Sequence, residues 1–179
     1  MGDLYKQYCK TYNDEKKDFD EFFEILEGIY DSEEVQGLAV YPHHRDIDRL
    51  QHVFSVTYLT YYLSKKFKLD YKSATRAACM HDLFYYDWYD GKTGKWHNMH
   101  GFKHPYFAYL NAKELYPELN KIECDAIKKH MWPLTPALPK YKESFVVSLS
   151  DKYCATREFL YSSSKKYKTR FLNDVKEVN

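Results

Sequence analysis

The chain contains 179 residues, which fits one domain of ordinary size and allows a sizeable core. Hydrophobic residues make up 44% and charged residues 30% of the chain, a balance that excludes a wholly disordered protein. The 27 Lys and Arg residues nearly balance the 26 Asp and Glu residues, which excludes both a polybasic nucleic-acid binder and an acidic solvating chain. Only six Gly and six Pro residues are present, which disfavours a turn-rich β-sandwich and favours helices.

Hydrophobic periodicity predicts three helices in the first half of the chain. The first spans residues 14–30 and carries one wide apolar face. The second spans residues 46–67, and the third follows Asp70 and stops shortly after Leu83. The polar, glycine-bearing stretch 85–101 is then predicted as the longest loop of the chain.

The second half of the chain predicts three further helices. Pro105 suits the first turn of the fourth helix, which ends just before Pro117. The fifth helix spans residues 119–130, and three prolines exclude a helix over residues 132–140. The sixth helix spans residues 141–160.

These elements predict a single all-α domain over residues 1–179, a bundle of about six to seven helices without a convincing strand pair. Residues 1–44 form an N-terminal helical extension to a core of residues 45–160, and residues 161–179 form a last docking helix. The four cysteines are scattered, and the longest charge-free apolar stretch, 53–64, is too short to span a bilayer. We therefore expect a cytoplasmic protein with no membrane partner.

Ionisable residues fall on apolar helix faces at five places along the chain. They are His52, His81, His104, His130 and Asp151. Each one alone is more simply explained as a core histidine or a capping carboxylate. Five of them on five helices favour a metal centre, because a buried Asp82 or Asp151 costs several kcal/mol without a partner and a divalent cation supplies one.

The order His52, His81-Asp82 and distant Asp151 resembles the HD-domain superfamily of metal-dependent phosphohydrolases. The segments QHVFSVTYLTYYLSKKFKLD and SATRAACMHDL resemble the helices that deliver the first histidine and the His-Asp pair. HPYFAYLNAKEL, IKKHMWPL and VSLSDKYCATREF resemble later segments of the six-ligand members. The resemblance covers residues 45–160 and suggests a small stand-alone bacterial member, with a ligand layout like that of the HD-type diadenosine tetraphosphate hydrolases.

The resemblance implies a central metal site and a hydrolytic activity. The implied metal ligands are His52, His81, Asp82, His104, His130 and Asp151. Such nitrogen and oxygen ligands suit divalent Mn, Fe, Co, Ni or Zn. Two ions bridged by Asp82 would clamp a phosphate and hold an attacking hydroxide. Members that lack the two later histidines hold one ion, so a single ion stays an alternative.

Three residues are expected to take part in catalysis itself: Asp82, Lys152 and His100. Lys152 would offset phosphate charge, with a solvent-facing lysine as its alternative. His100 would touch the leaving group or the phosphate, unless it simply belongs to the loop. Arg49, one turn before His52, is considered as a further phosphate contact. The aromatic residues of segment 85–88 either stack on a base or pack in the core, and His43 and His44 are expected at the surface.

The expected substrate is a nucleotide or another small phosphorylated metabolite, not a nucleic acid duplex. Cyclic-dinucleotide phosphodiesterases of the superfamily carry a lysine three positions after the paired aspartate, where this chain has Tyr85, and a Gly-Tyr-Pro loop that it lacks. That activity is therefore disfavoured. A nucleotide-binding regulatory module with little turnover is the alternative function, and a purely structural bundle is the third. The oligomeric state is left open, with a homodimer as one option.

Overall fold

The computed structural model describes residues 16–44, 47–86, 89–90, 95–96 and 100–162. The helices in these residues are α2 (Lys16–Ile25), α3 (Glu33–Gln36), the 3-10 helix η1 (Gly37–Val40), α4 (Arg49–Lys66), α5 (Tyr71–Met80), α6 (His100–Leu115), α7 (Lys121–Lys129) and α8 (Lys142–Ser162). The strands are β1 (Pro42–His44), β2 (Ile47–Asp48), β3 (Tyr89–Asp90) and β4 (Lys95–Trp96). Helices dominate, which confirms the predicted all-α class.

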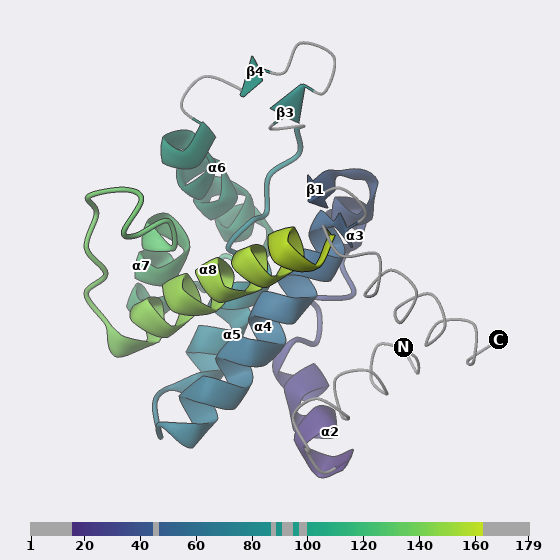
Figure 1. Ribbon diagram of the computed structural model, residues 1–179. Coiled ribbons are helices and arrows are strands. Elements are labelled where there is room, and N and C mark those ends of the chain that lie inside the picture. The colour runs from purple at the N-terminus through teal and green to yellow at the C-terminus, as the bar shows by residue number, and fades with distance from the viewer. Residues whose placement is uncertain (1–15, 45–46, 87–88, 91–94, 97–99, 163–179) are drawn as a thin grey trace, which may run out of the picture.

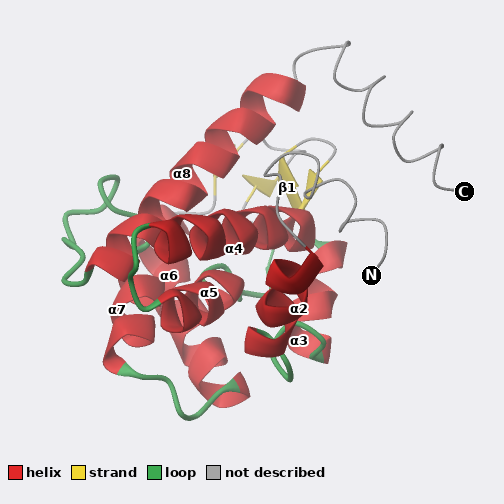
Figure 2. Cartoon of the chain, turned by 90° about the horizontal axis from the view of Figure 1, so that it is seen from below, coloured by secondary structure: helices red, strands yellow, loops and turns green. Residues whose placement is uncertain are grey.

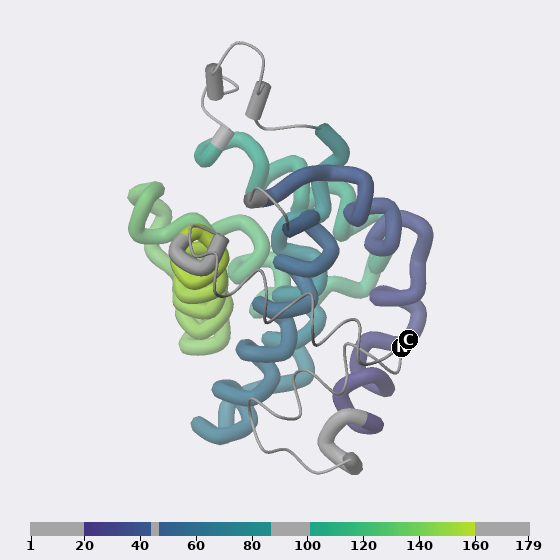
Figure 3. Tube along the Cα trace, turned by 45° about the vertical axis from the view of Figure 1, so that its right-hand side comes forward, coloured from purple at the N-terminus to yellow at the C-terminus, as the bar shows by residue number. Residues whose placement is uncertain are grey.

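The helices surround a central pair, α4 and α5, which pack against each other along their lengths. Helix α8 crosses in front of this pair, and α6 and α7 lie on the opposite side from α2 (Figure 1). The view from below shows α2 and α3 together beside α4 (Figure 2). In the tube view α8 is seen nearly end-on next to the central pair (Figure 3). The N-terminal end of α4 and the C-terminal ends of α5 and α7 are thus directed to a common region beneath α8.

Side-chain caps fix the ends of the helices that deliver this region. The Asp48 carboxylate accepts the backbone N–H of Gln51 at 2.8 Å, and the Gln51 side chain accepts the backbone N–H of Asp48 at 3.3 Å, which makes a capping box. Asn120 and Glu123 form the same box at the start of α7. Helices α5 and α7 end with His81 and His130 as their C-caps. The predicted stop after Leu83 therefore comes at Met80, slightly earlier than expected.

The structure corrects two predicted helices in the first half of the chain. The helix expected over 14–30 ends at Ile25, and turns follow it, because Gly28 adopts a positive φ of 74° that ends helical geometry. The helix expected over 46–67 begins only at Arg49, because Asp48 is its N-cap. Residues 14–15 and 46 lie outside the described residues.

The structure also corrects the placement of Pro105 and the absence of strands. Helix α6 begins at His100, so Pro105 lies inside the helix and not in its first turn. As the sixth residue of α6, Pro105 has no N–H to donate to the carbonyl of Gly101, so one intrahelical hydrogen bond is absent there. Two antiparallel pairs, β1–β2 and β3–β4, occur where no strand pair was predicted, since strands of two or three residues carry no usable periodicity.

Other predictions hold, and some fall beyond the described part of the chain. The fifth predicted helix is confirmed as α7, and the sixth is confirmed as α8. The proline-bearing residues 132–140 between them form no helix, as predicted. The last helix expected over 161–179 lies outside the described residues after Ser162. No described helix has the length and apolar character needed to cross a bilayer.

The apolar core runs through all the helices of the described residues, and its aromatic part lies between α2 and α4. Phe22 is fully buried, and its ring meets the rings of Phe54, Tyr58 and Tyr61 edge-on at centroid distances of 5.8, 5.4 and 5.4 Å. Edge-to-face packing of this kind adds stability beyond the area buried. This aromatic cluster holds the turns of α4 after the first one to α2 and leaves the first turn of α4 to other partners.

Candidate metal centre

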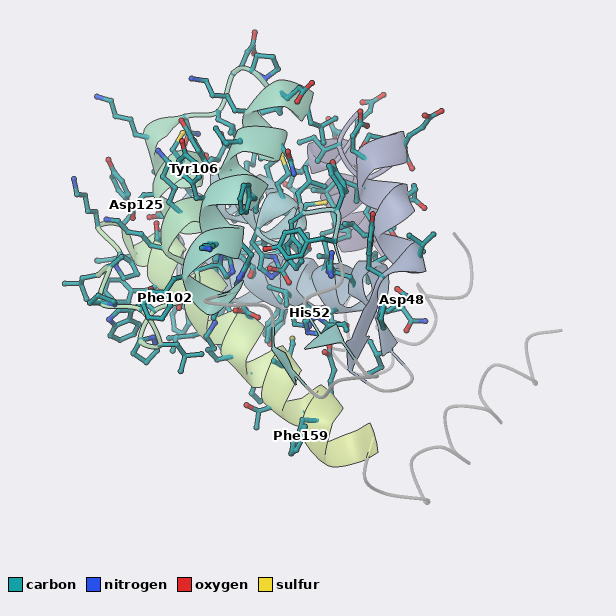
Figure 4. All side chains as sticks on the ribbon, turned by 90° about the horizontal axis from the view of Figure 1, so that it is seen from above. Asp48, His52, Phe102, Tyr106, Asp125 and Phe159 are labelled. Atoms are coloured by element: carbon teal, nitrogen blue, oxygen red, sulfur yellow. The ribbon has the colours of Figure 1, made fainter. Side chains whose placement is uncertain are left out.

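Six buried histidine and aspartate side chains converge beneath α8. They form two groups whose ligand atoms lie within 4.8 Å of one another, and these groups are His52, His81 and Asp151, and Asp82, His104 and His130. None of the six is more than 6% exposed. Figure 4 shows His52 in the middle of the molecule, whereas Phe102, Tyr106 and Phe159 lie at its edges. The structure thus brings together all six residues that were predicted as metal ligands.

The first group joins the central helices to α8. His52 lies in the first turn of α4, and its Nε2 atom is 3.2 Å from Oδ1 of Asp151 on α8. The Nε2 atom of His81, at the end of α5, is 4.0 Å from the same oxygen. Two imidazoles and one carboxylate therefore face a common point, which we name position one.

The second group lies between α6 and α7. Nε2 of His104, on α6, is 2.8 Å from Nε2 of His130, the C-cap of α7. Oδ1 of Asp82 is 3.3 Å from the first of these nitrogens and 3.5 Å from the second. We name this second point of convergence position two.

Asp82 connects the two positions. While its Oδ1 atom faces His104 and His130, its Oδ2 atom is 3.9 Å from Nε2 of His81 in position one. The helix ends at Met80, so His81 and Asp82 leave the helical turn that would hold adjacent side chains about 100° apart. One carboxylate therefore offers an oxygen to each position.

Hydrogen bonds hold three of the four histidines with Nε2 directed inward. Nδ1 of His81 donates to the carbonyl of Ala78 at 2.7 Å, and Nδ1 of His130 donates to the carbonyl of Ile127 at 2.8 Å. Nδ1 of His52 is 2.8 Å from the Glu158 carboxylate. A donating Nδ1 leaves the lone pair on Nε2, which is the arrangement typical of metal-ligating histidine.

One buried atom shows that this donor set fits a cation. Nε2 of His81 is buried without a hydrogen-bond partner, although it faces both aspartates. An unpaired buried polar atom is costly, and native proteins rarely leave one without a reason. A divalent metal ion that accepts this lone pair satisfies it, and the mixed nitrogen and oxygen ligands suit a transition metal.

The electrostatics of the two aspartates and of His81 favour the protonation states that metal ligation requires. Although burial raises the pKa of Asp82, the imidazoles of His81 and His104 outweigh it and hold that pKa well below the usual value. The same balance, with His52 and Lys152 as the main partners, keeps the pKa of Asp151 well below its usual value. Burial lowers the pKa of His81. Both carboxylates are therefore anionic and His81 is neutral near pH 7, as metal ligation requires.

His52 differs from the other rings. Burial lowers its pKa, but the Glu158 and Asp151 carboxylates outweigh burial and raise it to about 10. Burial and the neighbouring rings of His104 and His81 instead hold the pKa of His130 well below its usual value. Position one is thus the more negatively charged of the two environments, because carboxylates lie at both nitrogens of the His52 ring.

The other predicted site residues have different outcomes. Nζ of Lys152 contacts the Asp151 carboxylate of position one and donates to the main-chain carbonyl of His130 at 3.2 Å. His100 begins α6, but its side chain is outside the described residues. The phosphate contact considered for Arg49 is wrong. Its guanidinium is fully buried and donates to the carbonyls of Phe84 and Tyr86 at 2.5 and 3.0 Å.

Two residues of the site were missed by the sequence analysis. His43 was expected at the surface, but its ring stacks on His52 with centroids 3.8 Å apart, and His43, His52 and Asp82 form a further potential ligand group. Glu158 was not considered at all. It lies seven residues after Asp151 on α8, two helical turns along the same face, and this spacing was the available signal. His43 lies in a short strand and carried no such signal.

Comparison with known proteins gives one match. A family model of the HD domain matches residues 49–156, more than half of the chain. The chain belongs to the HD domain family. No curated protein and no solved structure matches it.

HD domains generally bind divalent metal ions and act as phosphohydrolases, and the six convergent side chains lie in the matched part of the chain. The match begins at Arg49, the first residue of α4, and ends two residues before Glu158. The resemblance seen in the sequence is therefore confirmed at the level of the HD family. The two missed residues, His43 and Glu158, both lie outside the HD match.

Proposed function

We propose that this HD domain is a metal-dependent phosphohydrolase that cleaves a phosphate ester or anhydride of a nucleotide or another small phosphorylated metabolite. The observation that carries the proposal is the Asp82 carboxylate, whose two oxygens face His81 on one side and His104 with His130 on the other. This arrangement supports two metal ions with Asp82 as the shared ligand. His52, His81 and Asp151 would hold one ion, and His104 and His130 the other.

The charge of the cluster explains why cations are required. Asp151 and Glu158 both contact the His52 ring, Asp82 faces the neighbouring His81 ring, and Lys152 pairs with Asp151, so three carboxylates surround position one. The side chains alone therefore leave an acidic site that repels a phosphate. Bound divalent cations reverse that sign, polarise the phosphate and lower the pKa of water. Substrate binding and turnover should both depend on the metal.

The protein's own residues orient the substrate. Lys152 is about a quarter exposed and pairs with Asp151 of position one, so its ammonium can exchange its bond to Asp151 for a phosphate oxygen. His100 would contact the leaving group or the phosphate, as the sequence predicts. The buried carboxylates and imidazoles would not bind the phosphate directly, because their inward-facing atoms would be the metal ligands.

An aromatic series next to position two supports a nucleotide as the substrate. The Phe84 ring lies 5.3 Å from the His104 ring and 4.8 Å from the Tyr86 ring, and Phe107 lies 6.1 Å from Tyr86. Phe84 is buried, Tyr86 is half-buried and Phe107 is 43% exposed, so the rings lead from the site to the surface. Arg49 covers the face of Phe84 at 3.6 Å from its centroid, so a base would stack on the outer rings, Tyr86 and Phe107.

Elemental analysis of the as-isolated protein, followed by a panel of nucleotides and phosphate esters with Mn²⁺ or Fe²⁺, tests the proposal. We expect bound transition metal and metal-dependent release of phosphate or a nucleoside phosphate. A ligand-induced thermal shift without any product would instead support a regulatory nucleotide-binding module. A protein that binds no transition metal and keeps the same fold would overturn the proposal.

A further inference from the structure

We propose that Glu158 is a positioning residue of the metal centre, which holds His52 in the orientation that presents Nε2 to position one. Its Oε2 atom is 2.8 Å from Nδ1 of His52, and both side chains are buried. The opposite nitrogen of the same ring faces Asp151 at 3.2 Å. This inference rests on the proposed metal-dependent function, because it concerns the affinity of the same site.

The position of His52 in its helix explains why it needs an acceptor from elsewhere. His81 and His130 are C-caps, and each donates Nδ1–H to the carbonyl three residues before it. His52 lies in the first turn of α4, and its Nδ1 finds its acceptor 106 residues away in sequence. Glu158 therefore does for His52 what a backbone carbonyl does for the other two rings. A carboxylate acceptor also raises the basicity of the ligand more than a carbonyl does.

His43 completes this support from the other face of the ring. Its imidazole stacks on His52 with an interplanar angle of 20°, and its Nε2 atom is 3.8 Å from Oε2 of Glu158. An imidazole holds a metal ion close to the plane of its own ring. Two rings stacked 3.8 Å apart cannot share one ion in this geometry. The structure therefore assigns His43 to covering the His52–Glu158 pair and not to a further ligand of position one.

Both supporting residues come from segments that flank the HD match. His43 lies in β1, and Glu158 lies near the C-terminal end of α8, which packs against β1 (Figure 1). The matched region 49–156 supplies the ligands, whereas these flanking segments fix the first of them. Metal affinity at position one should therefore depend on residues that the family match does not include.

Titration of Mn²⁺ into the full-length, metal-stripped protein tests the role of Glu158. We compare the wild type with Glu158→Gln, which keeps an acceptor oxygen but no charge, and with Glu158→Leu, which keeps neither. Loss of an outer-shell partner of this kind lowers metal affinity by about 10- to 100-fold. We expect a loss of this size in the Leu variant for the ion at position one, and a smaller loss in the Gln variant. The absorption spectrum of Co²⁺ bound at position one should change as well.

Glu123→Gln is the matched control. Glu123 is a fully buried carboxylate at the opposite end of α7 from His130, and it pairs with Arg76 at 2.6 Å. Its loss should lower the stability of the metal-free protein and leave Mn²⁺ affinity unchanged. Should the Leu variant fail to fold, the Gln variant decides alone. Wild-type affinity in Glu158→Leu, or in Glu158→Gln where the Leu variant does not fold, overturns this inference only, whereas a wild type that binds no metal overturns the proposed function as well.

Discussion

The two parts of α4 are built from opposite chemistry. Its first turn carries His52, which is surrounded by carboxylates and other imidazoles. Its later turns carry Phe54, Tyr58 and Tyr61, whose rings pack around Phe22 of α2. The aromatic part buries apolar surface and stabilises the fold by itself. The site part buries a histidine among carboxylates, next to the His81 ring, whose unpaired Nε2 atom gains a partner only when a cation binds. One helix therefore couples a self-sufficient core to a centre that is completed by a ligand.

Replacing Asp82 with Asn should have the largest effect, and it acts on the site alone. The bridging carboxylate would be lost, so we expect turnover to fall by about 10³-fold or more, equivalent to about 4 kcal/mol of transition-state stabilisation. Metal analysis and steady-state kinetics measure this. Asp125→Asn is the control, because Asp125 is buried beside Lys129 and Lys140 and should keep both metal and turnover. Full metal content and activity in Asp82→Asn would show that Asp82 does not bridge.

Replacing Phe22 with Ala should have the opposite result: it should lower the stability of the fold and leave metal binding unchanged. Truncation of a fully buried Phe costs about 3–5 kcal/mol, so denaturant unfolding should show a loss of that size. Folded protein should still bind metal with the wild-type stoichiometry. Phe159→Ala is the control, because Phe159 is 58% exposed and should change stability little. A loss of metal stoichiometry in folded Phe22→Ala protein would break the division of α4 into two independent parts.

These two regions also differ in how well the sequence predicts them. Apolar periodicity located the helices that form the core, and the same periodicity placed His52, His104 and His130 on inward faces. It failed for Arg49, which lies on the same helix but is buried by carbonyls of the segment after α5. It also failed for His43, because the stacking partner of a residue in a three-residue strand depends on long-range packing. Periodicity identifies the buried face of a helix but not the partner that meets it.

Within the site, Lys152→Met should have a smaller effect than Asp82→Asn. The methionine keeps much of the side chain's length and removes the charge, so we expect KM for an anionic substrate to rise about 10-fold, or about 1.4 kcal/mol. Metal stoichiometry should not change, since Lys152 supplies no ligand atom. Kinetics with one substrate from the panel measure this, with Lys142→Met, an exposed position at the start of α8, as the control. An unchanged KM would limit Lys152 to pairing with Asp151.

The smallest expected effect is a change in the free energy of unfolding, and it concerns the C-terminal end of α4, where polar groups border the aromatic cluster. The Glu21 carboxylate accepts hydrogen bonds from Lys65, Tyr71 and Tyr61, and these bonds lower its pKa from 4.5 to about 2. Because the folded-state pKa is depressed, the stabilisation is complete above the unfolded value near 4.5 and is lost as pH falls through about 2. The side chain is 30% exposed, so solvent screening reduces the effect to about 1 kcal/mol.

Glu21→Gln should therefore be less stable than the wild type in urea unfolding at pH 7, and the difference should shrink steadily below pH 4.5. Glu24→Gln, an exposed position one helical turn away, should show no such difference at any pH. Metal affinity at pH 7 should be the same in both variants, because neither residue contacts the site. A drop in metal affinity in Glu21→Gln would mean that the two ends of α4 are coupled, so that polar contacts at Lys65 help to hold His52 in place.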